Sequence, residues 1–208
     1  ICIDSVEQAL VAEVNGASRV ELCDNLLEGG TTPSAGNDKT SVSYGLPPPE
    51  EDVAFKHGIR GGDFVYTEMD FYVMKEDIKV AKQLGADGVV IGALTPSGDI
   101  DVPRMKELLE VARPMSVTFH RAFDLVRDPI QAAEQLMELG VDRILTSGHK
   151  RTAVEGLDLL VTLRKHCDDR IIIMPGSGVN ASNVRQLVDT MDPKEIHLSA
   201  AKLTASSM

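Results

Sequence analysis

Two cysteines and two acidic residues alternate with apolar side chains in the first two short hydrophobic runs of the chain. Cys2 and Asp4 alternate with two isoleucines in the first run, and Glu21 and Cys23 alternate with a valine and a leucine in the second. Side chains of a β-strand point alternately to its two faces, so the apolar set packs on one face and the polar set on the other. The pattern predicts that all four polar side chains point toward one interior.

The two thiols could do metal chemistry if their strands are neighbours. Parallel strands lie about 4.8 Å apart, so Cys2 and Cys23 would face each other at similar heights. Two facing thiolates can bind one soft Cu(I) ion, and in a reducing compartment this is preferred over a disulfide. The pair has no CxxC spacing, so the alternative that both are small buried hydrophobes is also open. The third cysteine, Cys167, is expected at the surface, at a helix end.

A second reading of the same interior is an enzyme site. Glu21 and His120 could serve as general acid and base, with Arg60 or Arg121 binding an anion and Ser147 orienting a substrate through its hydroxyl. The bland alternative is that the arginines are solvated or paired at the rim and the histidine is a satisfied core residue. These residues predict a small phosphorylated or anionic metabolite as the substrate class.

The ends of the last two apolar runs carry residues suited to a phosphate. Gly176 and Gly178 permit a close approach of backbone N–H groups to an anion, and Ser199 ends the following run, in which His197 is also expected to point inward. Loops at these positions hold phosphate in many α/β barrels. The alternative is that both glycines only make a tight turn.

Short apolar runs alternate with longer amphipathic stretches, which defines the elements that must position these residues. Phrases such as Gly85-Ala-Asp-Gly-Val-Val-Ile end a helix with a glycine and begin a buried strand. Strands are predicted at about 1–4, 19–23, 53–57, 88–93, 115–120, 143–147, 171–175 and 195–199. Helices are predicted at about 5–16, 67–85, 102–113, 128–139, 152–167 and 181–191.

Eight alternating units favour an α/β fold in which parallel strands close into a (β/α)8 TIM-type barrel, with an open doubly wound sheet as the alternative. We expect one domain over residues 1–208. Two places break the pattern: residues 35–52 contain three consecutive prolines and are expected to be extended rather than helical, and the polar C-terminus is too short for a full eighth helix. Uncovered apolar surface there predicts a homo-oligomer, as a dimer or a tetramer.

Composition limits the classes of partner. The formal net charge of −11 argues against nucleic-acid binding, which needs clustered Lys and Arg. No stretch has the length and apolarity of a membrane span, and the first residues have no signal-peptide pattern, so neither membrane insertion nor secretion is expected. An odd number of cysteines does not suit a secreted disulfide framework. These observations together predict a cytoplasmic protein.

Several phrases of the sequence, taken in order, resemble the CutC family of copper homeostasis proteins. They are CIDS at 2–5, RVELC at 19–23, EGGTTPS at 28–34, RGGDF at 60–64, VTFHRAFD at 117–124, LTSG at 145–148 and MPGSG at 174–178. The resemblance runs through nearly the whole chain except the divergent segment 35–58. There, family members have a helix, a Val-rich strand and an Ile-Arg-Pro-Arg phrase, of which this chain keeps only the second arginine, Arg60.

The resemblance implies a TIM-type barrel, a cytosolic location that in animals is also nuclear, and homo-oligomers. It also implies a role in copper handling through two cysteines that fall on Cys2 and Cys23. No enzymatic activity is firmly attached to the family, so copper binding and catalysis both stay open at this point.

Overall fold

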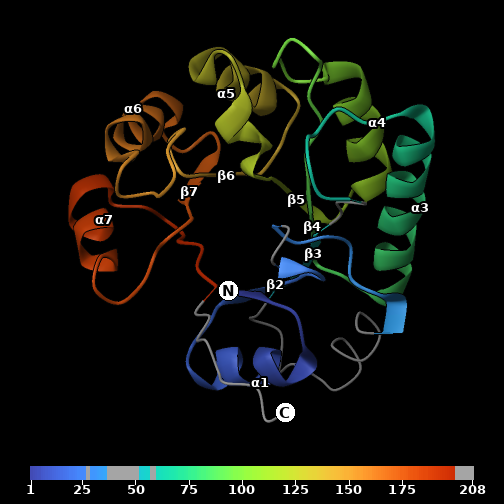
Figure 1. The fold of residues 1–208 in the computed structure, drawn as a ribbon, viewed down its shortest axis with the longest axis horizontal. Coiled ribbons are helices and arrows are strands. Elements are labelled where there is room, and N and C mark those ends of the chain that lie inside the picture. Colours follow the sequence, from blue (N-terminus) through green and yellow to red (C-terminus); the bar gives the residue numbers. More distant parts are fainter. Residues whose placement is uncertain (27–28, 37–51, 57–59, 200–208) are drawn as a thin grey trace.

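Seven parallel β-strands form the centre of the molecule, and helices surround them (Figure 1). The computed structural model describes residues 1–26, 29–36, 52–56 and 60–199. The strands are hydrogen-bonded in the order in which they occur in the chain. They are β1 (Cys2–Ile3), β2 (Arg19–Leu22), β3 (Asp52–Lys56), β4 (Gly88–Ile91), β5 (Ser116–Phe119), β6 (Arg143–Thr146) and β7 (Ile172–Pro175).

Helices alternate with these strands, as expected for parallel pairing. They are α1 (Val6–Val14), α3 (Glu68–Leu84), α4 (Val102–Ala112), α5 (Pro129–Glu138), α6 (Leu157–Cys167) and α7 (Val184–Met191), with a short 3-10 helix, η2 (Arg121–Leu125), after β5. Among the described residues, no helix is both long and apolar enough to cross a membrane.

Local sequence signals explain where the helices begin and end. In α3, Thr67 and Asp70 form a reciprocal capping box, and Gly85 ends the helix in a left-handed conformation. In α5, the Asp128 side chain accepts hydrogen bonds from two backbone N–H groups of the first turn, and Pro129 occupies the first helical position. Both helices lie where the sequence predicted them, at about 67–85 and 128–139.

The segment 195–199 closes the ring of strands without forming a regular strand. The N–H of His197 donates to the carbonyl of Pro175 at the end of β7 (3.0 Å), and the N–H of Cys2 in β1 donates to the carbonyl of Leu198 (2.9 Å). The strand predicted at 195–199 was therefore wrong as a strand, although the segment occupies the expected place between β7 and β1. One hydrogen bond to each neighbour is too few for a ladder.

The early irregular region is only partly within the described residues. The predicted weak third strand is confirmed: β3 pairs in parallel with both β2 and β4. Residues 35 and 36 are helical, contrary to the expected extended segment. Residues 37–51 lie outside the described residues, as do residues 200–208, where the truncated eighth helix was expected.

The core separates into an outer and an inner part. One continuous apolar cluster extends from Ile3 to Met191 and joins the outward faces of the strands to the helices. A smaller set of buried side chains lies outside that cluster, on the inward strand faces. It consists of Cys2, Cys23, Ala54, Val90, Leu145 and Met174, together with the polar Glu21, Thr118 and His120. The polar interior predicted from strand alternation is thus present.

Candidate functional site

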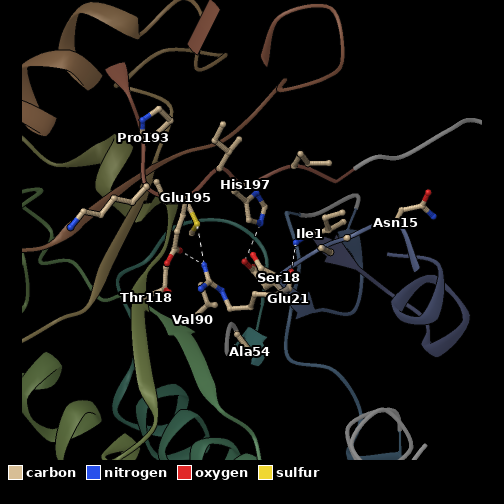
Figure 2. A pocket seen from close by; sticks show the side chains of 17 residues that line it. Ile1, Asn15, Ser18, Glu21, Ala54, Val90, Thr118, Pro193, Glu195 and His197 are labelled. Atoms are coloured by element: carbon tan, nitrogen blue, oxygen red, sulfur yellow. Dashed lines mark hydrogen bonds and ion pairs between the residues drawn. The ribbon is translucent and has the colours of Figure 1, made fainter. Parts of the chain in front are cut away.

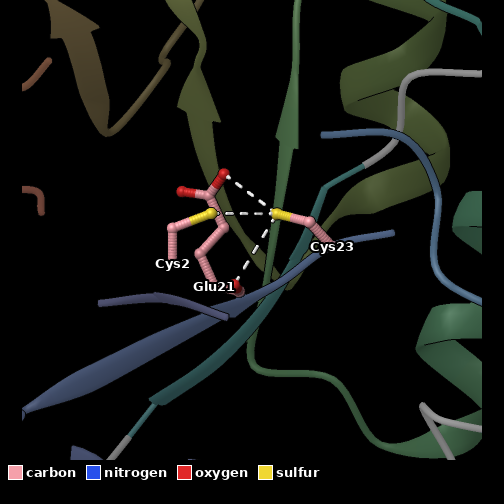
Figure 3. Close-up of side chains that lie close together, drawn as sticks. All are labelled: Cys2, Glu21 and Cys23. Carbon is pink, nitrogen blue, oxygen red and sulfur yellow. Dashed lines mark hydrogen bonds between the residues drawn. The ribbon is translucent and has the colours of Figure 1, made fainter. Parts of the chain in front are cut away.

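The sulfur atoms of Cys2 and Cys23 lie 3.2 Å apart inside the ring of strands. Cys2 pairs with Glu21 in the register of β1 and β2, and both cysteines are buried and unbridged by a disulfide (Figure 3). The separation is that of a hydrogen bond in which either sulfur can be the donor. The two side chains face each other as the alternation predicted, whereas Asp4, from the same run, is exposed.

Glu21 adds a carboxylate to the sulfur pair. Its Oε1 lies 3.8 Å from the Cys23 sulfur, and one donor atom from each of Cys2, Glu21 and Cys23 lies within 4.8 Å of the others. All three residues are buried. Two soft sulfur donors and one oxygen donor form a compact set with the chemistry of a site for a soft metal ion.

His197 pairs with the other oxygen of Glu21. Its Nε2 lies 3.0 Å from Glu21 Oε2, in a contact that leaves both side chains largely shielded from solvent. Burial opposes protonation of the ring, but the Glu21 carboxylate and the hydrogen bonds with Cys2 and Glu21 outweigh it and raise the pKa of His197 to about 9. The imidazole is therefore a cation at neutral pH, beside a carboxylate.

The same neighbours ionise Cys2. The hydrogen bond with Cys23 is the largest influence on its thiol, and with the contribution of His197 it lowers the pKa of Cys2 to about 6 in spite of burial. Cys2 is then a thiolate at neutral pH.

Cys167 was expected at the surface, but it is buried in α6, and this burial raises the pKa of its thiol to about 11.

Two features of the chain hold His197 in place although its segment is not a regular strand. A Cβ atom at Gly176 would lie 3.2 Å from the His197 Cβ and 2.5 Å from Leu145 Cδ1, so glycine leaves room for both side chains. Glu195, two residues before His197, accepts hydrogen bonds from Arg19 of β2 and Arg143 of β6. The segment is thus fastened to two strands by charged hydrogen bonds.

A cavity of about 390 Å³ reaches the Glu21–His197 pair. We call it the inner cavity; it lies between the loop before β2 and the segment 193–198, and includes inward side chains of β3, β4, β5 and β7 (Figure 2). Its lining comprises Ile1, residues 15–19, Glu21, Ala54, Val90, Thr118, Met174 and residues 193–198.

His120 lies in a different cavity, of about 270 Å³, formed by the loops that follow β2, β3 and β5. We call it the mouth cavity; its lining consists of Gly29, Gly30, Arg60, Gly61, Gly62, Phe64, Tyr66, His120, Arg121, Asp124 and Leu125. The predicted acid–base pair is therefore divided, because Glu21 lines the inner cavity and His120 the mouth cavity. The structure brings Glu21 together with His197 instead.

The other predicted enzyme residues also have defined places. Arg60 lines the mouth cavity, with its guanidinium donating to Asp63 and to the carbonyl of Val65. Ser147 is buried, and its hydroxyl contacts Asp124 and Arg121. Ser147 thus belongs to a network around Asp124 rather than to the lining of either cavity.

Packing explains the two glycines of the predicted phosphate site. Gly176 faces Leu145 and His197, as described above. Gly178 has a φ of +69°, and a Cβ there would lie 2.9 Å from Thr152 Cγ2. Ser199 is exposed. A phosphate site at these three residues stays a prediction.

Sequence reasoning placed His197 inward but gave it no role, and it gave none to Asp124 or Glu195. His197 is 176 positions from its partner Glu21, so no local spacing joins the two. The signal that was available is the alternation of His197 with Ile196 and Leu198, which pack on the outer core. Nothing local marked Asp124 or Glu195 as the centres of hydrogen-bond networks.

Known proteins resemble this chain over most of its length. The sequence model of the CutC family matches residues 1–202. A CutC family protein of Parabacteroides distasonis is 49% identical, over all of this chain and 84% of its own length. The human copper homeostasis protein cutC homolog is 45% identical, over all of this chain and 75% of its own length.

A solved structure shows the same fold. The crystal structure of the putative copper homeostasis protein CutC from Streptococcus agalactiae superposes with a TM-score of 0.89 at 35% identity, over 95% of each chain. This likeness confirms the TIM-type α/β fold predicted from the strand–helix alternation. With the match of the family model over nearly the whole sequence, it shows that the chain belongs to the CutC family.

Proposed function

We propose that this protein acts in copper homeostasis by binding one Cu(I) ion between Cys2 and Cys23. The observation that carries the proposal is the 3.2 Å separation of two buried sulfur atoms, with the Glu21 carboxylate beside them. Thiolates are preferred ligands of Cu(I), and the relatives named as copper homeostasis proteins support copper as the metal.

The donor set fits the charge of this ion. Cys2 is already a thiolate at neutral pH, so loading requires that only Cys23 lose a proton when Cu(I) enters. The site then exchanges one positive charge for another, and its net charge does not change. The His197 cation and its contact with Glu21 offset the concentration of negative charge in this buried place.

The sulfur pair has to open to admit the ion. Metal–thiolate bonds of about 2.3 Å in a linear arrangement would place the sulfurs roughly 4.6 Å apart. A third ligand bends the arrangement and shortens that separation, which favours Glu21 Oε1 as a participant. The carboxylate is a harder donor than sulfur, so the two cysteines supply most of the affinity.

A competition titration tests the proposal. Reduced protein is titrated anaerobically with Cu(I) against a chromogenic Cu(I) chelator, and one equivalent is expected to bind. Loss of a residue that only holds a metal ligand in place weakens metal binding roughly 10–100-fold. Cys2→Ser and Cys23→Ser each remove a ligand itself, so each should weaken Cu(I) binding by more than that. Cys167→Ser is the matched control, since this thiol is buried in α6, outside the ring of strands. Equal affinities in all four proteins would refute the proposal.

The enzyme alternative has less support from the geometry. Its acid and base, Glu21 and His120, line different cavities, and Glu21 is engaged with His197 and the sulfur pair. No observation favours turnover by that pair, so we do not pursue it as the function.

We further propose that the protein works in the cytoplasm, in animals also in the nucleus, where a reducing environment keeps both thiols available.

Self-association stays a prediction as well. Exposed apolar side chains support it: Val11 and Val14 on α1, and Met69 and Tyr72 on α3. Light scattering that reports a monomer at tens of micromolar would contradict self-association.

A further inference from the structure

The mouth cavity has the construction of a second ligand site, independent of the sulfur pair. Its lining comes from three separate loops, after β2, β3 and β5, at the carboxyl ends of the strands. Ligands of α/β barrels bind at this end, because the loops there can vary without disturbing the core. None of the lining residues is Cys2, Cys23 or Glu21, so the cavity needs its own explanation.

Arg121 is the side chain that defines the chemistry of this cavity. Its Nε donates to Asp124 Oδ2 at 2.8 Å, and its Nη2 donates to Ser147 Oγ at 3.0 Å. Its Nη1 makes no hydrogen bond within the part of the chain that the structure describes. A guanidinium held on one side in this way presents its remaining N–H groups at a fixed place, ready to bind an anion.

The support behind Arg121 is rigid. Asp124 is 7% exposed and also accepts hydrogen bonds from the backbone N–H and hydroxyl of Ser147, from the Thr146 hydroxyl and from the backbone N–H of His149. A buried carboxylate with this many donors cannot swing out with the arginine. Arg121 is therefore held in a more fixed orientation than the arginine of an ordinary surface ion pair.

The rest of the lining limits the size and character of the ligand. Arg60 adds a second guanidinium at the rim, with its own N–H groups directed to Asp63 and Val65. Phe64 and Tyr66 supply apolar walls, and Gly29, Gly30, Gly61 and Gly62 let backbone approach closely. A volume of about 270 Å³ is close to the lower end of ligand pockets, so the ligand is smaller than a nucleotide.

His120 contributes a further polar group to the same place. Its Nδ1 accepts a hydrogen bond from the backbone N–H of Ala122 at 3.2 Å, which places the proton of the neutral ring on Nε2. The ring packs against Phe64 in a tilted arrangement, with centroids 4.6 Å apart, and against Gly92, where a Cβ would lie 2.7 Å from His120 Cε1. The histidine thus stands in one orientation beside the arginine.

We propose that the mouth cavity binds a small metabolite through a carboxylate or phosphate group. Arg121 donates hydrogen bonds to this group from the N–H groups that Asp124 and Ser147 do not use. Carboxylate and phosphate each offer a pair of oxygens that can accept two parallel hydrogen bonds from a guanidinium. The ligand's remaining atoms lie against Phe64 and Tyr66. The site does not depend on copper, because none of its lining residues is a proposed metal ligand.

Calorimetric titration of copper-free protein with inorganic phosphate and, separately, with succinate tests the proposal. Saturable binding of either anion is expected, and the anion that binds shows whether Arg121 recognises a phosphate or a carboxylate. Arg121→Gln should weaken binding about tenfold or more, since it removes charged hydrogen bonds. Arg127→Gln is the matched control, because Arg127 is 66% exposed, pairs with Asp99 and lies outside the cavity lining.

Further variants keep the test decisive. Arg121→Lys keeps the charge without the fork and should also lose affinity, which covers the case that Arg121→Gln does not fold. Cys2→Ser should bind the anion as the unchanged protein does, so that failure of this proposal and failure of copper binding are told apart. Absence of binding by both anions, or equal binding by the Arg121 and Arg127 variants, would overturn it.

Discussion

Glu195→Gln should destabilise the protein by about 2 kcal/mol, because Glu195 fastens the segment that carries His197. Both Glu195 oxygens accept from Arg143 Nε, at 2.9 and 2.8 Å, and one also accepts from Arg19. Breaking a fully buried ion pair costs roughly 3–5 kcal/mol, and an exposed pair contributes about 0–1 kcal/mol. The Glu195 side chain is 22% exposed, with Arg19 at 19% and Arg143 at 13%, which places the cost between these limits.

Thermal unfolding measures this loss directly. For a chain of this size, 1 kcal/mol corresponds to roughly 2–4 °C in Tm, so the variant should melt about 4–8 °C lower at pH 7. Glu134→Gln is the control, since Glu134 also pairs with a cation and a histidine but is 39% exposed on the outer surface. Its melting temperature should change far less. Equal shifts for the two variants would refute the reasoning.

The same ion pairs predict the direction of the pH dependence. Burial opposes ionisation of Glu195, but the hydrogen bonds from Arg19 and Arg143 outweigh it and lower its pKa in the folded protein. A carboxyl whose pKa is lowered by folding stabilises the protein above its unfolded pKa of about 4.3, and that contribution is lost as pH falls through the folded value. The difference in Tm between the unchanged protein and Glu195→Gln should therefore shrink below about pH 4.

Two further predictions concern the glycine turns and the thiolate. Gly156→Ala should lower the free energy of unfolding by about 3 kcal/mol or more, because its Cβ would lie 1.9 Å from the Ser147 carbonyl oxygen. Gly16→Ala should lower it by only about 1–2 kcal/mol, because there is open space around that Cβ and only the φ of +82° is unfavourable. Urea unfolding measures both changes. His197→Asn should raise the pKa of Cys2 above about 6, because the imidazole no longer stabilises the thiolate. The ultraviolet absorbance of the thiolate, followed against pH, measures this pKa. The same titration midpoint in the variant and in the unchanged protein would contradict the prediction.

Much of the interior could be predicted because it depends on strand alternation. A period of two residues fixes the inward face once the apolar face is assigned, which is why Cys2, Glu21 and Cys23 were found together. The end of α3 at Gly85 and the start of α5 at Asp128 could also be predicted, since capping is a local property.

What could not be predicted depends on contacts between distant parts of the chain. The pairing of Glu21 with His197, and of Glu195 with Arg19 and Arg143, arises from closure of the ring and leaves no local spacing in the sequence. Alternation in residues 195–199 suggested a strand, but the single hydrogen bonds to β7 and β1 do not make a ladder. The division of Glu21 and His120 between two cavities likewise depends on how the loops fold over the strand ends.

X-ray absorption at the copper edge tests the central claim most directly. Reduced protein loaded with one equivalent of Cu(I) is expected to show two sulfur neighbours at the length of a metal–thiolate bond, about 2.2–2.3 Å, and Cys167→Ser should give the same spectrum. Cys2→Ser and Cys23→Ser should each lose one sulfur neighbour. A copper ion surrounded only by nitrogen and oxygen, or a sulfur count that neither substitution changes, would contradict the assignment of copper to Cys2 and Cys23.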